Sequence, residues 1–127
     1  MDKVTHFEVP AENVERAKEF YEKTFEWAIS KVPEMEYWMA HTGEVDENHM
    51  IKDKGDINGG MYKRGEGSSK HPVIVIDVQN IKETMEKIKS NGGKILCDIK
   101  DVGSMGKYAQ FEDSEGNTMG IWETLKK

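Results

Sequence analysis

The spacing of hydrophobic residues predicts two helices and eight strands along this chain. In two stretches the apolar residues recur three or four positions apart, which is typical of a helix with one buried face. These stretches cover about residues 13–25 and 80–91, and Asn13 and Asn80 stand where helix caps are expected. Shorter runs of alternating, aromatic or β-branched residues predict strands at 4–10, 27–32, 36–42, 57–63, 73–77, 94–99, 108–112 and 118–123.

The order strand, helix and three strands occurs twice in this pattern. Residues 6–9 (HFEV) align with residues 73–76 (VIVI) at a shift of 67 positions, 73 minus 6, and the helical stripes align at the same shift. Near the ends of the two halves, GMY at 60–62 resembles GIW at 120–122. We therefore expect an α+β fold with two tandem βαβββ modules around a shared cavity. They form one domain, 1–127, with module one at about 1–64, a linker at about 65–70 and module two at about 71–127.

Composition narrows the range of partners. The chain has 127 residues, a formal net charge of −6 and no run of more than two adjacent Lys or Arg residues, so a nucleic-acid partner is not expected. No apolar run approaches the ~20 residues of a membrane helix, and the first ten residues lack the apolar core of a signal peptide. We therefore expect a cytoplasmic protein that does not enter a membrane. The single cysteine, Cys97, excludes an intrachain disulfide.

Four segments together resemble the vicinal-oxygen-chelate superfamily, which contains glyoxalase I, bleomycin-resistance proteins and extradiol dioxygenases. The segments are FEVPAENVERAKEFYEKTFEW at 7–27, INGGMYKR at 57–64, VIDVQNIKETMEKIKSNGGKI at 75–95 and YAQFEDSEGNTMGIWE at 108–123. Within the superfamily the chain looks most similar to small glyoxalase-related proteins. The resemblance implies helices outside a curved mixed sheet, which forms a cup lined by alternate strand residues. It also implies a homodimer.

The resemblance further implies where a metal ion would bind. Metal-dependent members carry a His on the first strand, a carboxylate on the fourth, a His on the fifth and a carboxylate on the eighth. The corresponding residues here are His6, Gly60, Val73 and Gly120. Only His6 has a side chain that can bind a metal, so we expect no cofactor and no metal ion at the family's position.

A divalent metal at a shifted position remains an alternative. His71 lies two residues before Val73 and shares its strand parity, so His6, Glu8 and His71 could supply such a site. Glu123 has the opposite parity to Gly120. The remaining histidines, His41 and His49, are expected on the surface.

Four residues are candidates for ligand binding without a metal. His6 and Glu8 lie two apart on one strand face, where they could touch and act as acid and base, or could simply be hydrogen-bonded wall or dimer-interface residues. Tyr62 and Trp122 occupy matched positions in the two halves and could offer flat surfaces to a ligand, or could instead pack at the floor of the cup or the subunit interface.

Three functions follow from these observations. The first is a metal-free protein that binds a small molecule in the cup and sequesters it. The alternative is a lyase or isomerase of the glyoxalase type, with a displaced metal site or a His6–Glu8 acid–base pair. The third is a module that binds a protein partner through the cup or the polar loop 43–56. The fold alone does not choose among them.

Overall fold

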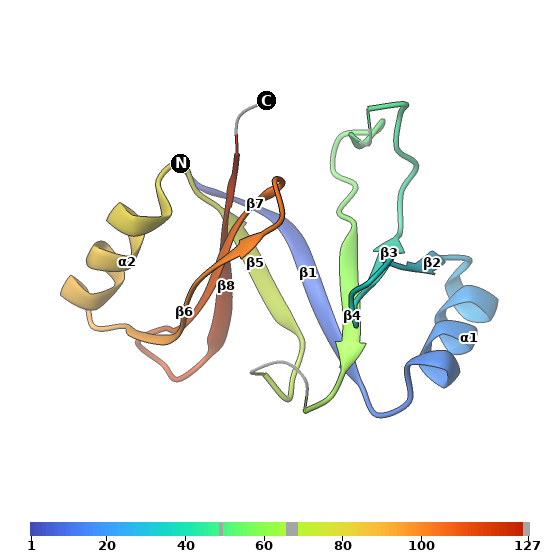
Figure 1. Ribbon diagram of the computed structural model, residues 1–127, viewed down its shortest axis with the longest axis horizontal. Coiled ribbons are helices and arrows are strands. Elements are labelled where there is room, and N and C mark those ends of the chain that lie inside the picture. Colours follow the sequence, from blue (N-terminus) through green and yellow to red (C-terminus); the bar gives the residue numbers. More distant parts are fainter. Residues whose placement is uncertain (49, 66–68, 126–127) are drawn as a thin grey trace. The chain divides into compact units, whose positions relative to one another are not determined.

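Eight strands and two helices form an α+β fold in the described part of the chain, as the hydrophobic spacing predicted (Figure 1). The structure is a computed structural model and describes residues 1–48, 50–65 and 69–125. The elements are β1 (Lys3–Ala11), α1 (Val14–Phe25), β2 (Ala28–Lys31), β3 (Trp38–His41), β4 (Gly59–Lys63), β5 (Val73–Asp77), α2 (Ile81–Ser90), β6 (Lys94–Val102), β7 (Gly106–Glu112) and β8 (Thr118–Thr124).

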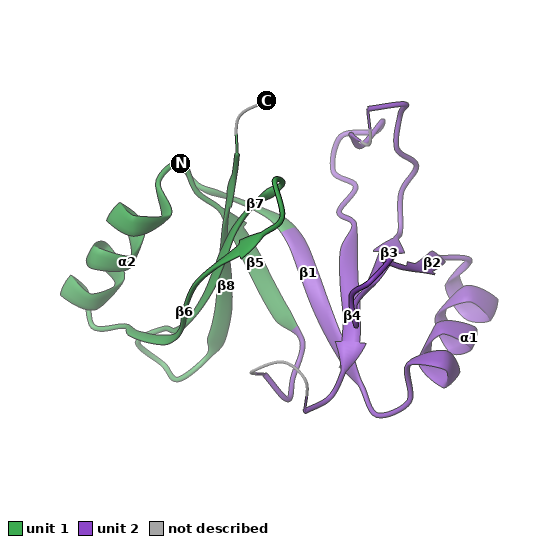
Figure 2. Ribbon diagram, in the orientation of Figure 1, with its two compact units in different colours: residues 1–5, 73–127 green, residues 6–72 purple. Residues whose placement is uncertain are grey.

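The chain divides into two compact units (Figure 2). Unit 2 comprises residues 6–72 and contains most of β1 together with α1, β2, β3 and β4. Unit 1 comprises residues 1–5 and 73–127 and contains β5, α2, β6, β7 and β8. The division between the units falls after Pro72, just beyond the expected linker, of which residues 66–68 lie outside the described residues.

Unit 2 holds a mixed sheet in the order β2-β3-β4-β1. Neighbouring strands are antiparallel except β4 and β1, which run parallel. The register places Gly60 of β4 between Met39 of β3 and Glu8 of β1. Residues from three separate strands therefore meet at this glycine.

Unit 1 repeats the same pattern with its own strands, in the order β5-β8-β7-β6. Here β5 and β8 are parallel, and the other neighbours are antiparallel. Gly120 of β8 lies between Val75 of β5 and Gln110 of β7. The prediction of two βαβββ modules is confirmed, and Gly60 and Gly120 occupy equivalent positions in them.

Local hydrogen bonds at the helix ends follow the sequence pattern. The side chain of Asn13 accepts a hydrogen bond from the backbone of Arg16, and Asn80 accepts one from Glu83, both at 3.0 Å. Helix α2 ends at Ser90, and Gly92 just beyond its C-cap Asn91 has a φ of 95°, in the left-handed region. These bonds form within a few residues, so the sequence alone can predict them.

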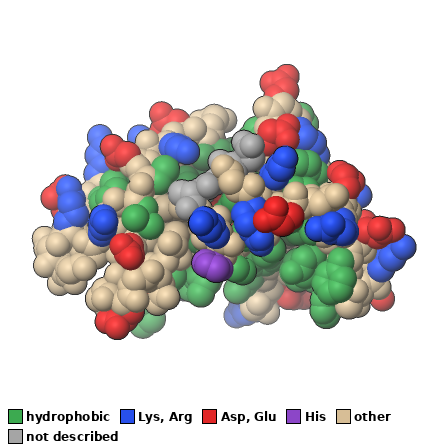
Figure 3. Space-filling view, turned by 90° about the horizontal axis from the view of Figure 1, so that it is seen from below, with side chains coloured by type: hydrophobic (Ala, Val, Ile, Leu, Met, Phe, Trp, Pro, Cys, Tyr) green, Lys and Arg blue, Asp and Glu red, His purple; other side chains and the backbone are tan. Residues whose placement is uncertain are grey.

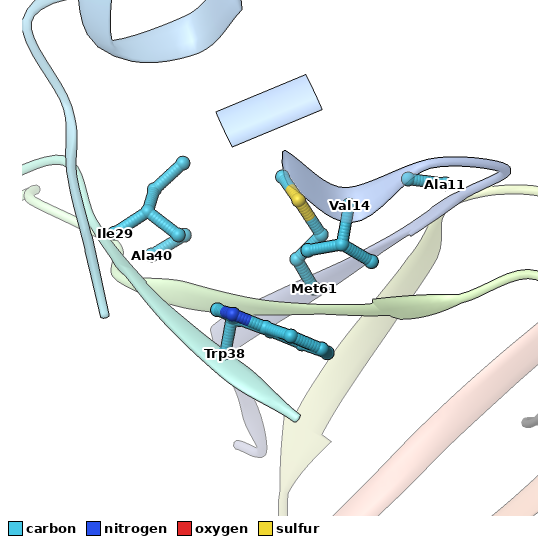
Figure 4. Packing of buried hydrophobic residues seen from close by; sticks show 6 residues of the cluster. All are labelled: Ala11, Val14, Ile29, Trp38, Ala40 and Met61. Carbon is cyan, nitrogen blue, oxygen red and sulfur yellow. The ribbon is translucent and has the colours of Figure 1, made fainter. Parts of the chain in front are cut away.

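A hydrophobic core between helix and sheet lies in each unit. In unit 2, α1 contributes Val14 to a cluster with Met61 of β4, and Figure 4 shows this packing. The full buried cluster is Ala11, Val14, Ile29, Trp38, Ala40 and Met61. In unit 1 the corresponding cluster is Val78, Ile81, Met85, Ala109 and Ile121. Each helix therefore covers one face of its own sheet.

Strand alternation directs another set of side chains to the opposite face. Phe7 packs against the core of unit 2, so His6 and Glu8 on either side of it point away from α1. Gly60 and Tyr62 alternate with the buried Met61 in the same way. We call this the face opposite α1, and it carries the candidate site.

Three expected strands are shorter in the structure, those at 27–32, 36–42 and 57–63, and four are longer, those at 4–10, 94–99, 108–112 and 118–123. The strand expected at 36–42 spans only Trp38–His41, because the carbonyl of Tyr37 closes a turn with the backbone N–H of Val32 at 2.9 Å. The strand expected at 57–63 begins at Gly59. The strand expected at 94–99 continues to Val102, with irregular register in its pairing to β7.

The surface is charged and mixed in sign. Figure 3 shows acidic and basic side chains interspersed with hydrophobic ones on the face that it presents. Among the described residues, no helix is long and apolar enough to span a bilayer.

Candidate functional site

Tyr37 joins His6 and Glu8 into one hydrogen-bonded group on the face opposite α1. The Tyr37 hydroxyl lies 2.9 Å from His6 Nε2. The same hydroxyl donates to Glu8 Oε2 at 3.1 Å. The sequence predicted that the imidazole and the carboxylate could touch, and the structure places a phenol hydroxyl between them. We call these three residues the His6–Tyr37–Glu8 group.

The register of β3 and β4 explains the position of Tyr37. Met39 pairs with Gly60, and Tyr37 precedes Met39 by two residues, so its side chain reaches the same sheet face. A Cβ atom on Gly60 would overlap the hydroxyl and ring of Tyr37. The glycine therefore makes room for the phenol. By the family resemblance, this is the position of a carboxylate ligand.

Burial sets the electrostatics of the group. Glu8 is a buried charged residue with 8% of its surface exposed. Burial lowers the pKa of His6 from 6.5 to about 4, so its imidazole is neutral at pH 7. Burial, followed by the nearby charge of Glu8, raises the pKa of Tyr62 above its ordinary value. The group therefore combines a neutral imidazole, a hydroxyl and a carboxyl group in a partly dehydrated setting.

Unit 1 contains an equivalent tyrosine with different partners. Tyr108 precedes Gln110 by two residues, as Tyr37 precedes Met39, and a Cβ on Gly120 would lie 3.0 Å from its hydroxyl. Gln110 Nε2 donates to that hydroxyl at 2.7 Å. Val75 stands opposite Gly120, where unit 2 has Glu8 opposite Gly60. The residue paired with the glycine is therefore apolar in unit 1 and a carboxylate in unit 2.

The two predicted aromatic surfaces differ in exposure. Tyr62 is buried, with 6% of its surface exposed, and its hydroxyl donates to the carbonyl of Ser69 at 3.2 Å. Trp122 is half-buried and packs over Gly106, and its indole N–H donates to Thr124 Oγ1 at 2.9 Å. Their matched positions two residues after Gly60 and Gly120 place each on the same face as its glycine.

The other ionisable candidates, Glu123, His71 and His41, differ from His6 and Glu8 in their contacts and exposure. Glu123 accepts a hydrogen bond from the backbone N–H of Ile81 at 2.8 Å, so its opposite parity directs it to the start of α2. His71 is exposed. His41 is half-buried and lines an open surface hollow of about 460 Å³, and His49 lies outside the described residues.

The donor set does not fit the metal site that the family resemblance implies. Gly60, Val73 and Gly120 have no side-chain donor, and His6 Nε2 already bonds to Tyr37. Within residues 1–48, 50–65 and 69–125, no three His, Cys, Asp or Glu side chains gather closely enough to hold an ion. The alternative grouping of His6, Glu8 and His71 is therefore not assembled in the structure.

Comparison with known proteins identifies the family. Residues 3–121 match the Glyoxalase/Bleomycin resistance protein/Dioxygenase superfamily. The chain belongs to this superfamily. A glyoxylase-like domain-containing protein from Didymella fabae is 32% identical over 124 residues, which cover 93% of this chain and 91% of that protein. The resemblance inferred from the four sequence segments is confirmed.

Solved structures of other proteins share the fold with low sequence identity. A hypothetical protein from Bacillus halodurans has a TM-score of 0.66 and 13% identity, covering 99% of this chain and 96% of its own. Methylmalonyl-CoA epimerase from Mycobacterium tuberculosis has a TM-score of 0.62 and 11% identity, covering 97% and 88%. At these identities the likeness concerns the fold and not the reaction.

Sequence reasoning missed Tyr37 and Tyr108 as members of the site region. A partial signal was present, because glycine inside a strand often marks the close approach of another group. The adjacent glycines Gly59 and Gly60 carried that signal. They could not indicate which residue approaches, since Tyr37 is 23 positions earlier, 60 minus 37, in an aromatic run.

Proposed function

We propose that this superfamily member binds an organic small molecule on the face opposite α1, without a metal ion at the family's position. The observation that supports this proposal is the Tyr37 hydroxyl, which lies over Gly60 and bonds to both His6 and Glu8. A partly buried polar group whose members come from β1 and the turn before β3 and are hydrogen-bonded to one another is preorganised for a ligand, because little freedom remains to be lost on binding.

The His6–Tyr37–Glu8 group would supply directional hydrogen bonds to that ligand. Imidazole, hydroxyl and carboxyl groups together provide both donors and acceptors, which favours a small polar or aromatic compound over a purely apolar one. Tyr62 lies close enough for the charge of Glu8 to raise its pKa, so its ring belongs to the same neighbourhood. For unit 1 taken by itself, Trp122 stays a separate prediction as a ligand contact, and Trp122→Ala tests it.

A lyase or isomerase is the second candidate, and one observation favours it. A neutral imidazole and a carboxyl group connected through one hydroxyl form a short path for protons. Such a group could take a proton from a bound substrate and return it elsewhere. In this reading His6 and Glu8 would be the acid–base pair, and their loss would reduce turnover more than ligand affinity.

A thermal-shift screen with matched variants tests the proposal. The full-length protein is screened against a small-molecule library and divalent metals, with and without a chelator, because a ligand of the native state raises the unfolding midpoint. Tyr37→Phe is compared with Tyr108→Phe, which removes the equivalent hydroxyl in unit 1. We expect organic compounds to stabilise the wild type and Tyr108→Phe, and to stabilise Tyr37→Phe less.

Two outcomes would count against the proposal. Stabilisation that requires an added divalent metal and disappears with the chelator would favour a metal-dependent protein. Stabilisation that is equal in Tyr37→Phe and wild type would place the ligand elsewhere. If the wild type converts a bound compound into a product and His6→Gln does not, the lyase or isomerase function would be favoured over sequestration of a ligand.

A further inference from the structure

The Tyr37 hydroxyl must divide one proton between two neighbours. A phenol donates one hydrogen bond and accepts others. It lies within bonding distance of Glu8 Oε2 and His6 Nε2 at the same time. If its proton points to Glu8, then His6 must carry a proton on Nε2 and donate to the phenol oxygen. If its proton points to His6, the Nε2 atom must be bare.

The ionisation state of the Glu8 carboxyl group distinguishes these two arrangements. An ionised carboxylate can only accept hydrogen bonds, and a hydroxyl that donates to it stabilises the ionised form. Bonds to a charged acceptor are also stronger than neutral ones. The opposite arrangement would require Glu8 to be a neutral carboxylic acid. The geometry with Tyr37 donating to Glu8 is therefore the one in which each partner plays its ordinary role.

The remaining ring nitrogen of His6 is Nδ1. Within the described part of the chain, His6 forms its hydrogen bond only through Nε2. His6 as a whole is partly exposed. A proton on Nε2 leaves Nδ1 with a free lone pair, because a neutral imidazole carries only one N–H.

We infer that Tyr37 and Glu8 hold His6 in the Nε2–H tautomer, so that Nδ1 is a hydrogen-bond acceptor that selects ligands carrying an O–H or N–H donor. Tyr37 is then a positioning residue that acts through His6. The ligand part of this inference rests on the proposed function, whereas the tautomer does not. The neutral state of His6 at pH 7, which follows from its lowered pKa, is consistent with both parts.

Side-chain nitrogen NMR of the full-length protein tests the tautomer directly. Spectra that correlate the imidazole nitrogens with the ring carbon-bound protons distinguish a protonated nitrogen from a bare one, and His6→Gln assigns the His6 signals among the four histidines. We expect Nε2 protonated and Nδ1 bare in the wild type at pH 7. Tyr37→Phe should shift the population toward Nδ1–H, and Tyr108→Phe should leave the His6 signals unchanged.

Each alternative result would overturn the tautomer assignment. A wild-type His6 that carries its proton on Nδ1 would mean that Tyr37 donates to His6 and that Glu8 is protonated. A wild-type imidazolium at pH 7 would also exclude a free acceptor. An unchanged tautomer in Tyr37→Phe would show that the hydroxyl does not control it.

Phenol and anisole test the selection of donors. The two compounds differ by one methyl group, which replaces the hydroxyl proton. We expect phenol to move the Nδ1 signal of His6, and anisole to bind roughly fivefold to tenfold more weakly, as for the loss of one hydrogen bond. Equal affinities for phenol and anisole would contradict the proposal that His6 selects ligands with a hydrogen-bond donor. The same holds if phenol, added up to its solubility limit, does not shift the Nδ1 signal of His6. Because the tautomer is measured without ligand, failure of the proposed function would leave that result standing.

Discussion

The phenol of Tyr37 occupies the space that a side chain on Gly60 would need. Gly60 lies in β4, and Tyr37 immediately precedes the neighbouring strand β3, so their close approach brings the hydroxyl between His6 and Glu8. In unit 1, Tyr108 and Gly120 repeat the relationship with more clearance. Gly60, which the resemblance aligns with the family's carboxylate position, is thus part of a packed arrangement with Tyr37.

The first prediction concerns this contact. Gly60→Ala should lower the free energy of unfolding by about 1–3 kcal/mol, because the added methyl group overlaps Tyr37 and forces it to move. Urea denaturation measures the change. Gly120→Ala is the matched control and should cost less, since its Cβ would lie 3.0 Å from the Tyr108 hydroxyl. If the cost of Gly60→Ala is no smaller in a Tyr37→Ala background, the overlap is not its cause.

The second prediction concerns pH. The pKa of His6 is lowered from 6.5 to about 4 by burial, so between these values the unfolded chain binds more protons than the native protein. The free energy of unfolding should therefore be highest above pH 6.5 as far as His6 is concerned. It should decrease by up to about 3 kcal/mol as the pH falls toward 4, because the unfolded chain takes up a proton on His6 that the native protein excludes. Denaturation at several pH values should show this slope in the wild type and in the exposed-site control His71→Gln. A slope that persists unchanged in His6→Gln would assign it to other groups.

The third prediction separates a structural carboxylate from a ligand-binding one. Glu123 accepts the backbone N–H of Ile81 at the start of α2, so Glu123→Ala should cost about 1 kcal/mol of stability, as for the loss of a helix cap. It should leave the binding of any compound from the thermal-shift screen unchanged. Glu115→Ala, in the exposed turn between β7 and β8, should change neither quantity. If Glu123→Ala loses ligand affinity, Glu123 contributes to the binding site, which would contradict the prediction.

The fourth prediction concerns assembly. We expect a homodimer, so sedimentation should give twice the chain mass of 14.5 kDa. Phe20 and Phe25 on α1 are more than half exposed, and large exposed aromatic side chains are typical of contact surfaces. The double variant Phe20→Ser/Phe25→Ser should therefore weaken the dimer. A wild type of 14.5 kDa would contradict the dimer, and an unaffected dimer in the double variant would place the interface elsewhere.

The element order, the helix caps and the duplicated βαβββ pattern could all be predicted from the sequence. Each depends on residues a few positions apart, such as Asn80 with Glu83, or on spacing that repeats along the chain. Strand parity was equally predictable, so His6 and Glu8 were correctly assigned to one face, opposite Phe7. Strand ends were less accurate, because turn closure by Tyr37 and irregular pairing of β6 depend on partners distant in sequence.

The sequence by itself determined the fold class, the family and the identity of Gly60, Val73 and Gly120, the three positions that the resemblance aligns with metal ligands and that carry no side-chain donor. Only the tertiary structure showed that the side chain of Tyr37 fills the space beside Gly60 in unit 2. Tyr37 lies 31 residues from His6 and 29 from Glu8, and the pairing of β3 with β4 and of β4 with β1 sets their meeting point. Such a contact depends on the register of three strands at once, which local spacing does not encode.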